Sequence, residues 1–194
     1  MEEKLLEVRH LKKYFHTPAG LLHAVDDVDF SIPKGKTMGV VGESGCGKST
    51  LGRSLLCLEP PTAGEILFEG KNIAALSKRE MKKVRPKIQM VFQDPYSSLN
   101  GRMTVRQLIA EPLLVNKICK NRAEVDQKVD EMMETVGLAK RLDMAYPHEL
   151  DGGRRQRIGI ARALIQNPEF VVCDEPVSAL DVSIQAQILN LLMD

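Results

Sequence analysis

The chain has 194 residues, of which 43% are apolar and 27% are charged, as is ordinary for a soluble globular protein with one domain or two small ones. Its 27 basic and 26 acidic side chains give a net charge of +1, so no general electrostatic field draws it to nucleic acid or an anionic membrane, and we expect no nucleic-acid partner. No apolar run approaches the roughly 20 residues that span a bilayer, and the charged N-terminus is unlike a signal peptide, so we expect a cytoplasmic protein or subunit.

The N-terminal part of the chain shows the alternation of half-exposed antiparallel strands. Residues 5–14 and 25–32 alternate apolar and polar side chains, most clearly at Val28, Phe30 and Ile32. Residues 65–69 form a further short strand, which Gly70 ends. We therefore predict an antiparallel β-layer that flanks the next motif.

A glycine-rich loop with the sequence GESGCGKST matches the phosphate-binding pattern G-x-x-x-x-G-K-[ST] at every fixed position. It follows the apolar run 37–41, which we predict as a buried parallel strand, and precedes a predicted helix over 49–58. The loop N–H groups would hold a phosphate chain, Lys48 would reach the terminal phosphates and Ser49 would ligate magnesium. The predicted cofactor-binding residues here are Gly42, Glu43, Ser44, Gly45, Cys46, Gly47, Lys48, Ser49 and Thr50. The alternative, a glycine-rich turn without a ligand, is disfavoured by the strand–loop–helix context.

The middle of the chain is mainly helical. A capping box at Ser77-Lys78-Arg79-Glu80 opens a short basic helix that Pro86 stops, and residues 88–92 form an apolar strand with Gln93 at its end. From there to about Gly153 we predict a helical insert, which contains a second capping box at residues 104–107. One helix carries an apolar stripe of Val125, Val129, Met132, Met133 and Val136, ended by Gly137, and its methionines are interpreted as core rather than as a ligand face.

An acidic pair follows the last predicted strand. A helix over 154–166 is broken by Pro168, and the apolar strand 170–173 ends in Asp174-Glu175. In an open α/β sheet this strand end lies beside a P-loop. Asp174 would then hold magnesium opposite Ser49, and Glu175 would orient or deprotonate the water that attacks the γ-phosphate. An isolated pair would be interpreted as a solvated turn, and the P-loop in the same chain favours the catalytic interpretation.

The cysteines indicate a reducing compartment. They are scattered without a C-x-x-C pair, which leaves both a zinc site and a disulfide framework weakly supported. The four are Cys46, Cys57, Cys119 and Cys173.

Taken together, these motifs resemble the nucleotide-binding subunits of ABC transporters over the whole chain. Besides GESGCGKST and FVVCDEP, VFQDP has Gln93 where the family has its Q-loop, SALD has Asp181 where it has its D-loop, and HELDGGRRQR stands at its signature. Tyr14 matches the family's aromatic residue that stacks on adenine, although a strand tyrosine by itself would be interpreted as core or surface. The segments YFHTPAG, LHAVDDVDFSI, GESGCGKSTLGRSLL and VFQDPYSSLN are similar to ATPases of oligopeptide and dipeptide importers, with related nickel importers as an open alternative.

The resemblance implies a fold: an α/β P-loop NTPase (RecA-like) core with an N-terminal antiparallel β subdomain and an inserted α-helical subdomain. Residues 1–194 would form a single ABC-type nucleotide-binding domain. Within it, residues 1–92 and 159–194 would hold the β subdomain and the core, and residues 93–158 the Q-loop and the helical subdomain with the signature.

The resemblance also implies a mechanism, in which two such subunits sandwich two ATP molecules with Mg²⁺, each between one chain's P-loop and the other chain's signature. Hydrolysis then reopens the sandwich. The implied catalytic residues are Glu175, Lys48 and Gln93, and the implied metal ligands are Ser49, Gln93 and Asp174. Outside the P-loop, the implied cofactor-binding residues are Tyr14, Gln93, Asp151, Gly152 and Gly153.

The implied partners are membrane proteins and a second ATPase subunit. Transmembrane permease subunits would be contacted through a groove beside Gln93 and the helical insert, and an extracytoplasmic solute-binding protein would act indirectly. The expected location is therefore the cytoplasmic face of the cell membrane, as a peripheral subunit.

Two features depart from the family pattern. The family signature is L-S-G-G-Q, whereas this chain has Leu150-Asp151-Gly152-Gly153-Arg154. A carboxylate 4 Å from a phosphate charge costs about 4 kcal/mol at an effective dielectric of about 20, and Arg154 is placed to neutralise Asp151 or to contact the phosphate itself. Only 19 residues follow Glu175, without the family's switch histidine, so the chain is expected to be a fragment or a truncated subunit. Two functions stay open: an ATP-hydrolysing importer subunit, or a nucleotide-binding but hydrolysis-deficient structural or regulatory half of a heterodimer.

Overall fold

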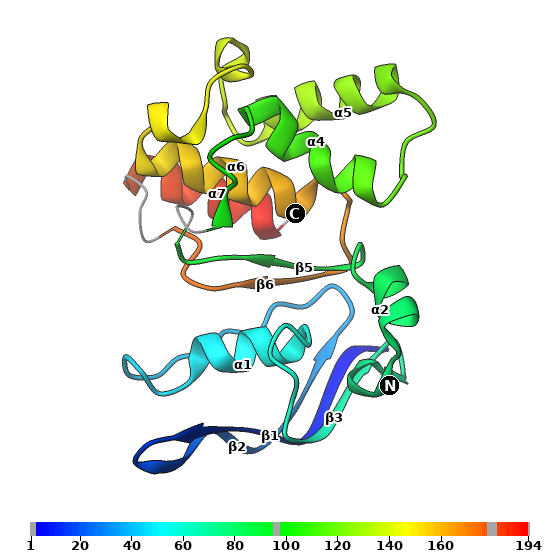
Figure 1. Ribbon diagram of the computed structural model, residues 1–194, viewed down its shortest axis with the longest axis vertical. Helices are drawn as coiled ribbons and strands as arrows, with labels where there is room; N and C mark the ends of the chain where they lie inside the picture. Colours follow the sequence, from blue (N-terminus) through cyan, green and yellow to red (C-terminus); the bar gives the residue numbers. More distant parts are fainter. Residues whose placement is uncertain (1–2, 95–97, 178–181, 194) are drawn as a thin grey trace. The chain divides into compact units, whose positions relative to one another are not determined.

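The computed structural model describes residues 3–94, 98–177 and 182–193 (Figure 1). They group into two compact units, residues 1–84 and residues 85–194, which are described in turn.

The first unit is built on an antiparallel sheet with the strand order β2-β1-β3-β4. The bounds are β1 Lys4–Thr17, β2 Gly20–Pro33, α1 Lys48–Leu55, β3 Ala63–Phe68, β4 Lys71–Asn72, η1 Ile73–Ala75 and α2 Lys78–Val84. The predicted antiparallel β-layer is confirmed, with a longer hairpin than the sequence indicated. Leu6, Leu11 and Ile66 are fully buried, so the alternating apolar positions line one face of this sheet.

Strand β1 contains a bulge that both of its neighbours accommodate. Between Val8 and Leu11 it has one residue more than β2, and between Arg9 and Lys12 one more than β3. His10 takes up the extra residue with φ 48°, in the left-handed region. The bulge switches the buried positions of β1 from even numbers, at Val8, to odd numbers, at Leu11.

The predicted strand over residues 37–41 is wrong. No described residue of this segment belongs to a sheet, and the side chains of Met38, Val40 and Val41 are exposed. A parallel strand that is buried on both faces exists only where neighbouring strands accept its hydrogen bonds. The sheet of this unit consists of β2, β1, β3 and β4, and within the described residues none of these strands pairs with residues 37–41. Apolar composition by itself therefore did not make a strand here.

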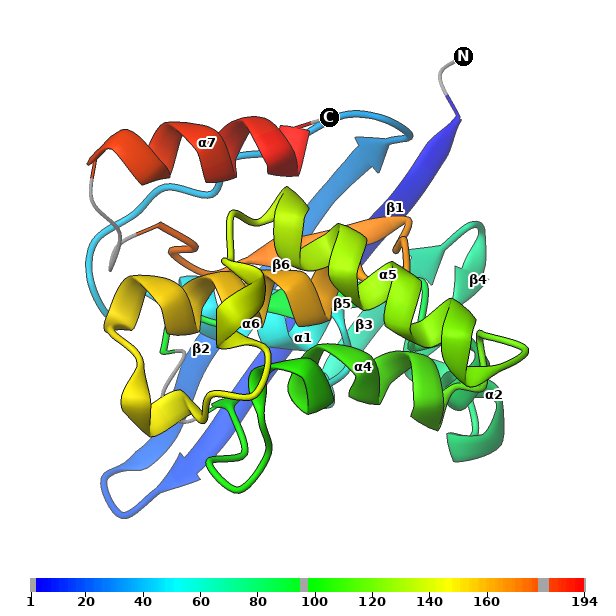
Figure 2. The same ribbon diagram turned by 90° about the horizontal axis from the view of Figure 1, so that it is seen from above.

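The second unit contains a parallel strand pair and a set of helices. Its elements are β5 Ile88–Val91, α4 Val105–Val115, α5 Arg122–Thr135, η2 Lys140–Leu142, η3 Pro147–Glu149, α6 Gly152–Leu164, β6 Phe170–Cys173 and α7 Val182–Met193. The two strands pair in parallel from Ile88 with Phe170 to Val91 with Cys173. Figure 2 shows α4, α5 and α6 packed together, with a shared core made by buried residues such as Leu108, Val129 and Ile158.

Local signals for helix starts and ends were reliable. Thr104 and Gln107 form the reciprocal capping box that opens α4, and Ser77 and Glu80 exchange the same pair of bonds before α2. The predicted apolar stripe is buried apart from Met132, which is half-buried, and Gly137 follows it with φ 67°. Within the described ranges, none of the helices has the length and apolarity that a bilayer crossing needs.

Candidate functional site

The glycine-rich loop of the first unit, predicted to bind phosphate, contains two glycines with left-handed backbone. Gly45 has φ 79°, and Gly47, the N-cap of α1, has φ 97°. A Cβ on Gly47 would lie 2.1 Å from the carbonyl oxygen of Ala24 in β2, so no side chain fits there. The Gly47 carbonyl accepts the first helical bond, from the N–H of Leu51 at 2.8 Å. The loop backbone is thus fixed against the hairpin at the start of a helix, where N–H groups attract anions.

Lys48 closes the loop from inside. Its ammonium donates to the carbonyl oxygens of Gly42 at 2.8 Å and Glu43 at 2.7 Å, and lies 3.9 Å from the Cys46 sulfur. Because the Lys48 side chain folds back over the loop, its positive charge lies at the centre of the loop. A phosphate chain offers this ammonium stronger, charge-assisted acceptors than carbonyls do. With the Ser49 hydroxyl next along the helix, this donor set fits the phosphates and metal ion of Mg-ATP.

Tyr14, the predicted adenine-stacking residue, lies on the same hairpin as Ala24. Tyr14 pairs across the strands with His23, and their rings stack with centroids 3.9 Å apart and an interplanar angle of 19°. The Tyr14 hydroxyl donates to the carboxylate of Asp26, and this hydrogen bond raises the pKa of Tyr14 to about 12. The same bond lowers the pKa of Asp26. The stacked rings of Tyr14 and His23 therefore lie beside Ala24, which directly follows His23 and whose carbonyl oxygen fills the space of a Gly47 side chain.

In the second unit, Gln93 and Glu175 meet at the carboxyl ends of the parallel strands. The Gln93 side-chain amide donates to Oε2 of Glu175 at 2.8 Å, and the N–H of Asp174 donates to the carbonyl of Val91 at 3.0 Å. Glu175 has φ 47°, so the chain turns sharply where β6 ends. Two residues predicted as catalytic, 82 positions apart in sequence, are thus brought into direct contact.

Gln156 was missed by the sequence reasoning. Its side chain is 2% exposed and donates to the carbonyl oxygens of Pro176 at 2.8 Å and Phe92 at 3.4 Å, which ties together the segments after β5 and β6. A signal was present: Gln156 shares the buried face of α6 with Ile160 and Ala163, where a polar side chain needs partners. It holds the segments that carry Gln93 and Glu175.

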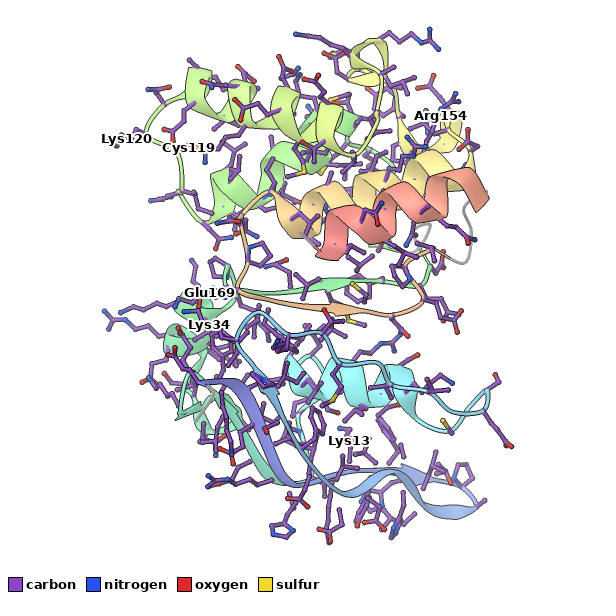
Figure 3. The ribbon with its side chains drawn as sticks, turned by 180° about the vertical axis from the view of Figure 1, so that it is seen from behind. Lys13, Lys34, Cys119, Lys120, Arg154 and Glu169 are labelled. Atoms are coloured by element: carbon purple, nitrogen blue, oxygen red, sulfur yellow. The ribbon has the colours of Figure 1, made fainter. Side chains whose placement is uncertain are left out.

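The altered signature caps its own helix. One carboxylate oxygen of Asp151 accepts the N–H of Arg154 at 2.7 Å, as an N-cap residue does, and the other lies 3.1 Å from the Arg154 guanidinium. Figure 3 shows Arg154 at the N-terminal end of α6. Neutralisation of Asp151 by Arg154, one of the two predicted roles of that arginine, is therefore the arrangement observed. Gly152 and Gly153 form the first turn.

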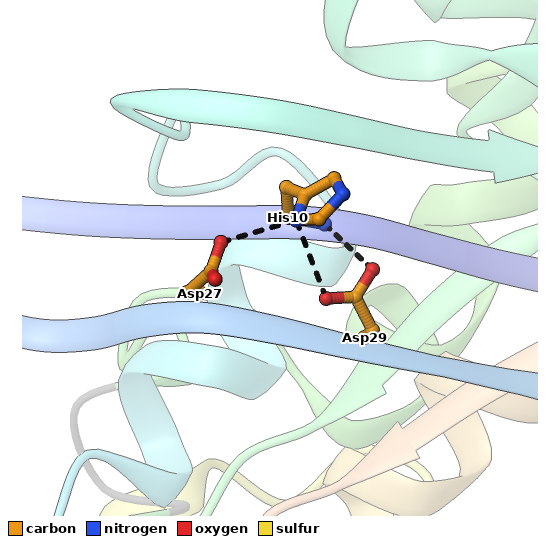
Figure 4. Close-up of side chains that lie close together, drawn as sticks. All are labelled: His10, Asp27 and Asp29. Atoms are coloured by element: carbon orange, nitrogen blue, oxygen red, sulfur yellow. Dashed lines mark hydrogen bonds and ion pairs between the residues drawn. The ribbon is translucent and has the colours of Figure 1, made fainter.

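A further polar cluster lies at the β1 bulge (Figure 4). The backbone N–H of His10 donates to the carboxylate of Asp29 at 2.9 Å, and ring nitrogen Nδ1 of His10 lies 3.2 Å from the carboxylate of Asp27. These three residues are exposed, and the ring nitrogen and carboxylate oxygens that could hold a metal ion lie within 4.8 Å of one another. The cluster fixes the bulge, and we assign it no part in the nucleotide site.

Some predictions are not tested by this geometry. Ser49 and Asp174 belong to different units, so their joint binding of magnesium stays a prediction. Asp181, predicted for the D-loop, lies outside the described residues.

The glycine-rich loop, its lysine and the acidic end of a parallel strand define a P-loop protein. The sequence profile of the family described as ABC transporter matches residues 25–178, and the chain belongs to that family. The resemblance inferred from the motifs is thereby confirmed.

Curated relatives and solved structures agree with this assignment. The chain is 56% identical over 195 residues to the oligopeptide transport ATP-binding protein OppF of Bacillus subtilis (strain 168), covering 100% of this chain and 64% of the relative. It is 52% identical over 200 residues to OppF of Haemophilus influenzae (strain ATCC 51907 / DSM 11121 / KW20 / Rd), covering 98% of this chain and 60% of the relative. The chain thus spans less than two thirds of these proteins.

The fold is also that of a solved cassette. A dimeric structure of the ATP-binding cassette MJ0796, in a post-hydrolysis state bound to ADP and Pi, superposes with a TM-score of 0.89 at 29% identity. The match covers 96% of this chain and 81% of that one. The predicted fold class, an α/β P-loop core with an antiparallel β subdomain and a helical subdomain, is confirmed.

Proposed function

We propose that this chain binds Mg-ATP and, paired with a second such subunit, hydrolyses it to drive the import of oligopeptides through membrane permease subunits. The observation that carries the proposal is the loop from Gly42 to Thr50, whose glycine geometry and central Lys48 ammonium suit a phosphate chain. The names of the relatives, which are oligopeptide transport proteins, support the solute class.

The residues divide the work of binding and hydrolysis. Lys48 and the loop N–H groups hold the phosphates, and Tyr14 supports the base. Ser49, Gln93 and Asp174 are the residues that would hold Mg²⁺, which neutralises charge on the phosphates when bound. Glu175 orients the attacking water and accepts its proton, and the amide of Gln93 fixes the direction of that carboxylate. Gln156 keeps both segments in place.

Partner contacts follow the same proposal. A second subunit would contribute Asp151, Gly152 and Gly153 to the site, and the dimeric structure of the similar cassette MJ0796 supports this pairing. The permease would dock beside Gln93, where a cavity of about 110 Å³ is lined by residues of β5, α4 and α6, among them Gln89 and Arg162. A solute-binding protein would deliver the peptide, and the subunit would work at the cytoplasmic face of the membrane. The domain limits 1–92 with 159–194, and 93–158, are part of this proposal.

The binding step is tested by calorimetry with Mg-ATP. Wild type should bind, and Lys48→Ala should lose binding because the charge inside the loop disappears. Lys36→Ala, an exposed lysine before the loop, is the matched control and should bind as wild type does. Equal affinity of wild type and Lys48→Ala would show that the loop is not the phosphate site. Glu175→Gln should bind ATP and lose turnover.

The solute is tested by uptake. In cells that use this protein for import, Lys48→Ala should abolish uptake of a labelled tetrapeptide and leave uptake of a free amino acid unchanged. Loss of nickel uptake instead of peptide uptake would support the nickel-importer alternative. ATP binding by the paired subunits without turnover in wild type would support the hydrolysis-deficient alternative.

A further inference from the structure

His23 and Asp26 lie where they can act on the nucleotide through Tyr14. The register of the hairpin sets Tyr14 directly opposite His23, and the rings stack at 3.9 Å with an interplanar angle of 19°. At this short centroid separation and small angle the two rings lie face to face. Each ring therefore covers one face of the other.

One carboxylate fixes both rings. Asp26 accepts the Tyr14 hydroxyl on Oδ1, and its Oδ2 lies 3.4 Å from Nδ1 of His23. At the other end, the Tyr14 backbone N–H donates to the Thr62 hydroxyl at 2.9 Å. The tyrosine is thus held at its backbone, its ring face and its hydroxyl, which removes most of the rotamer freedom that a lone strand tyrosine would lose on binding a ligand.

The stack stands next to the phosphate loop. Ala24 directly follows His23, and its carbonyl oxygen occupies the space where a side chain on Gly47 would be. A base attached to a phosphate chain in the loop therefore has a flat ring within the same unit to rest on. His23 is the residue that joins this ring to the loop contact.

We propose that His23 and Asp26 are positioning residues that hold Tyr14 rigid as the platform for the nucleotide base, an inference that rests on the proposed function. His23 forms the second layer of the stack and Asp26 fixes the hydroxyl. Their contribution is confined to ligands that carry a base, because neither residue hydrogen-bonds to the phosphate loop among the contacts of the described residues. The class of ligand is an aromatic nucleoside triphosphate.

The test compares two ligands, Mg-ATP and inorganic tripolyphosphate with Mg²⁺, by calorimetry on the full chain. His23→Ala should weaken ATP binding about three- to tenfold, the range of a lost aromatic stack, and leave tripolyphosphate binding unchanged. His23→Phe, which keeps a flat ring, should restore ATP binding. His16→Ala, an exposed histidine two residues beyond Tyr14, is the matched control and should change neither ligand.

Other results would overturn the inference. Equal weakening of both ligands by His23→Ala would show a structural effect on the hairpin. Unchanged or tighter ATP binding would show that His23 does not support the base, or occupies its place. Failure of the proposed function is distinguished by Lys48→Ala, which would then leave both ligands unaffected.

Discussion

The carboxylate of Asp151 should stabilise this chain through its cap on α6, which gives a stability prediction that does not depend on nucleotide. Asp151→Ala removes both the bond to the Arg154 N–H at 2.7 Å and the ion pair at 3.1 Å. Loss of an N-cap costs about 1 kcal/mol, and a half-exposed ion pair adds about 0.5 kcal/mol or less. Asp151→Ser retains a capping oxygen, so it should lose only the contribution of the ion pair, about 0.5 kcal/mol or less.

Urea unfolding followed by far-ultraviolet circular dichroism measures the difference. The expected free energy of unfolding falls by about 1.5 kcal/mol for Asp151→Ala and by about 0.5 kcal/mol for Asp151→Ser. Arg154→Gln keeps the backbone N–H and should match Asp151→Ser. Equal losses for Asp151→Ala and Asp151→Ser would refute the cap as the source of the stability.

The same geometry changes what the altered signature should do in a dimer. A bare carboxylate near a phosphate would cost about 4 kcal/mol, or about three decades of closure. With Arg154 beside it, Asp151 should cost less, so Asp151→Ser in a Glu175→Gln background should strengthen ATP-driven dimerisation by less than three decades. Arg154→Gln should weaken it, because the carboxylate loses its counter-charge. Light scattering measures both, and stronger dimerisation of Arg154→Gln would contradict this reasoning.

Further substitutions test other parts of the site. Gly47→Ala should abolish ATP binding in calorimetry because its Cβ would lie 2.1 Å from a carbonyl oxygen, whereas Gly39→Ala, which meets nothing within 4 Å, should bind normally. In ultraviolet titration, the phenol of Tyr14 should show a pKa of about 12, because the carboxylate of Asp26 favours the protonated phenol. Asp26→Asn should return this pKa towards the ordinary tyrosine value of about 10. An unchanged titration would remove Asp26 as the cause. Gln156→Ala should lower the free energy of unfolding by about 1–3 kcal/mol in urea, because two carbonyl oxygens lose their partner.

The sequence predicted those parts of the molecule whose causes are local. Alternation gave the hairpin, and the capping boxes at Ser77 and Thr104 marked helix starts, because each signal depends on residues a few positions apart. The glycines of the phosphate loop were recognisable for the same reason, as their backbone conformations follow from the lack of a Cβ.

What depended on distant partners was not predictable. The apolar run 37–41 carries no information on which strand would accept its bonds, and it is not in a sheet. The stack of Tyr14 on His23 depends on a strand register that bulges shift, and the bonds of Gln156 join segments 64 and 20 residues away. The role of Asp151 as a cap was within reach, since aspartate before a helix is a common N-cap. The sequence prediction for Asp151 considered only its charge.

The bulge at His10 determines which changes of length the hairpin can accept. Because the extra residue lies between Val8 and Leu11, deletion of His10 would remove this bulge and leave both of these side chains facing the core. Deletion of Lys12 instead would turn the remainder of β1 over, so that Tyr14 would point away from His23 and Asp26. Length variation among proteins of this kind should therefore be concentrated at the bulge, and a chain that lost one residue there would keep the stack of Tyr14 on His23.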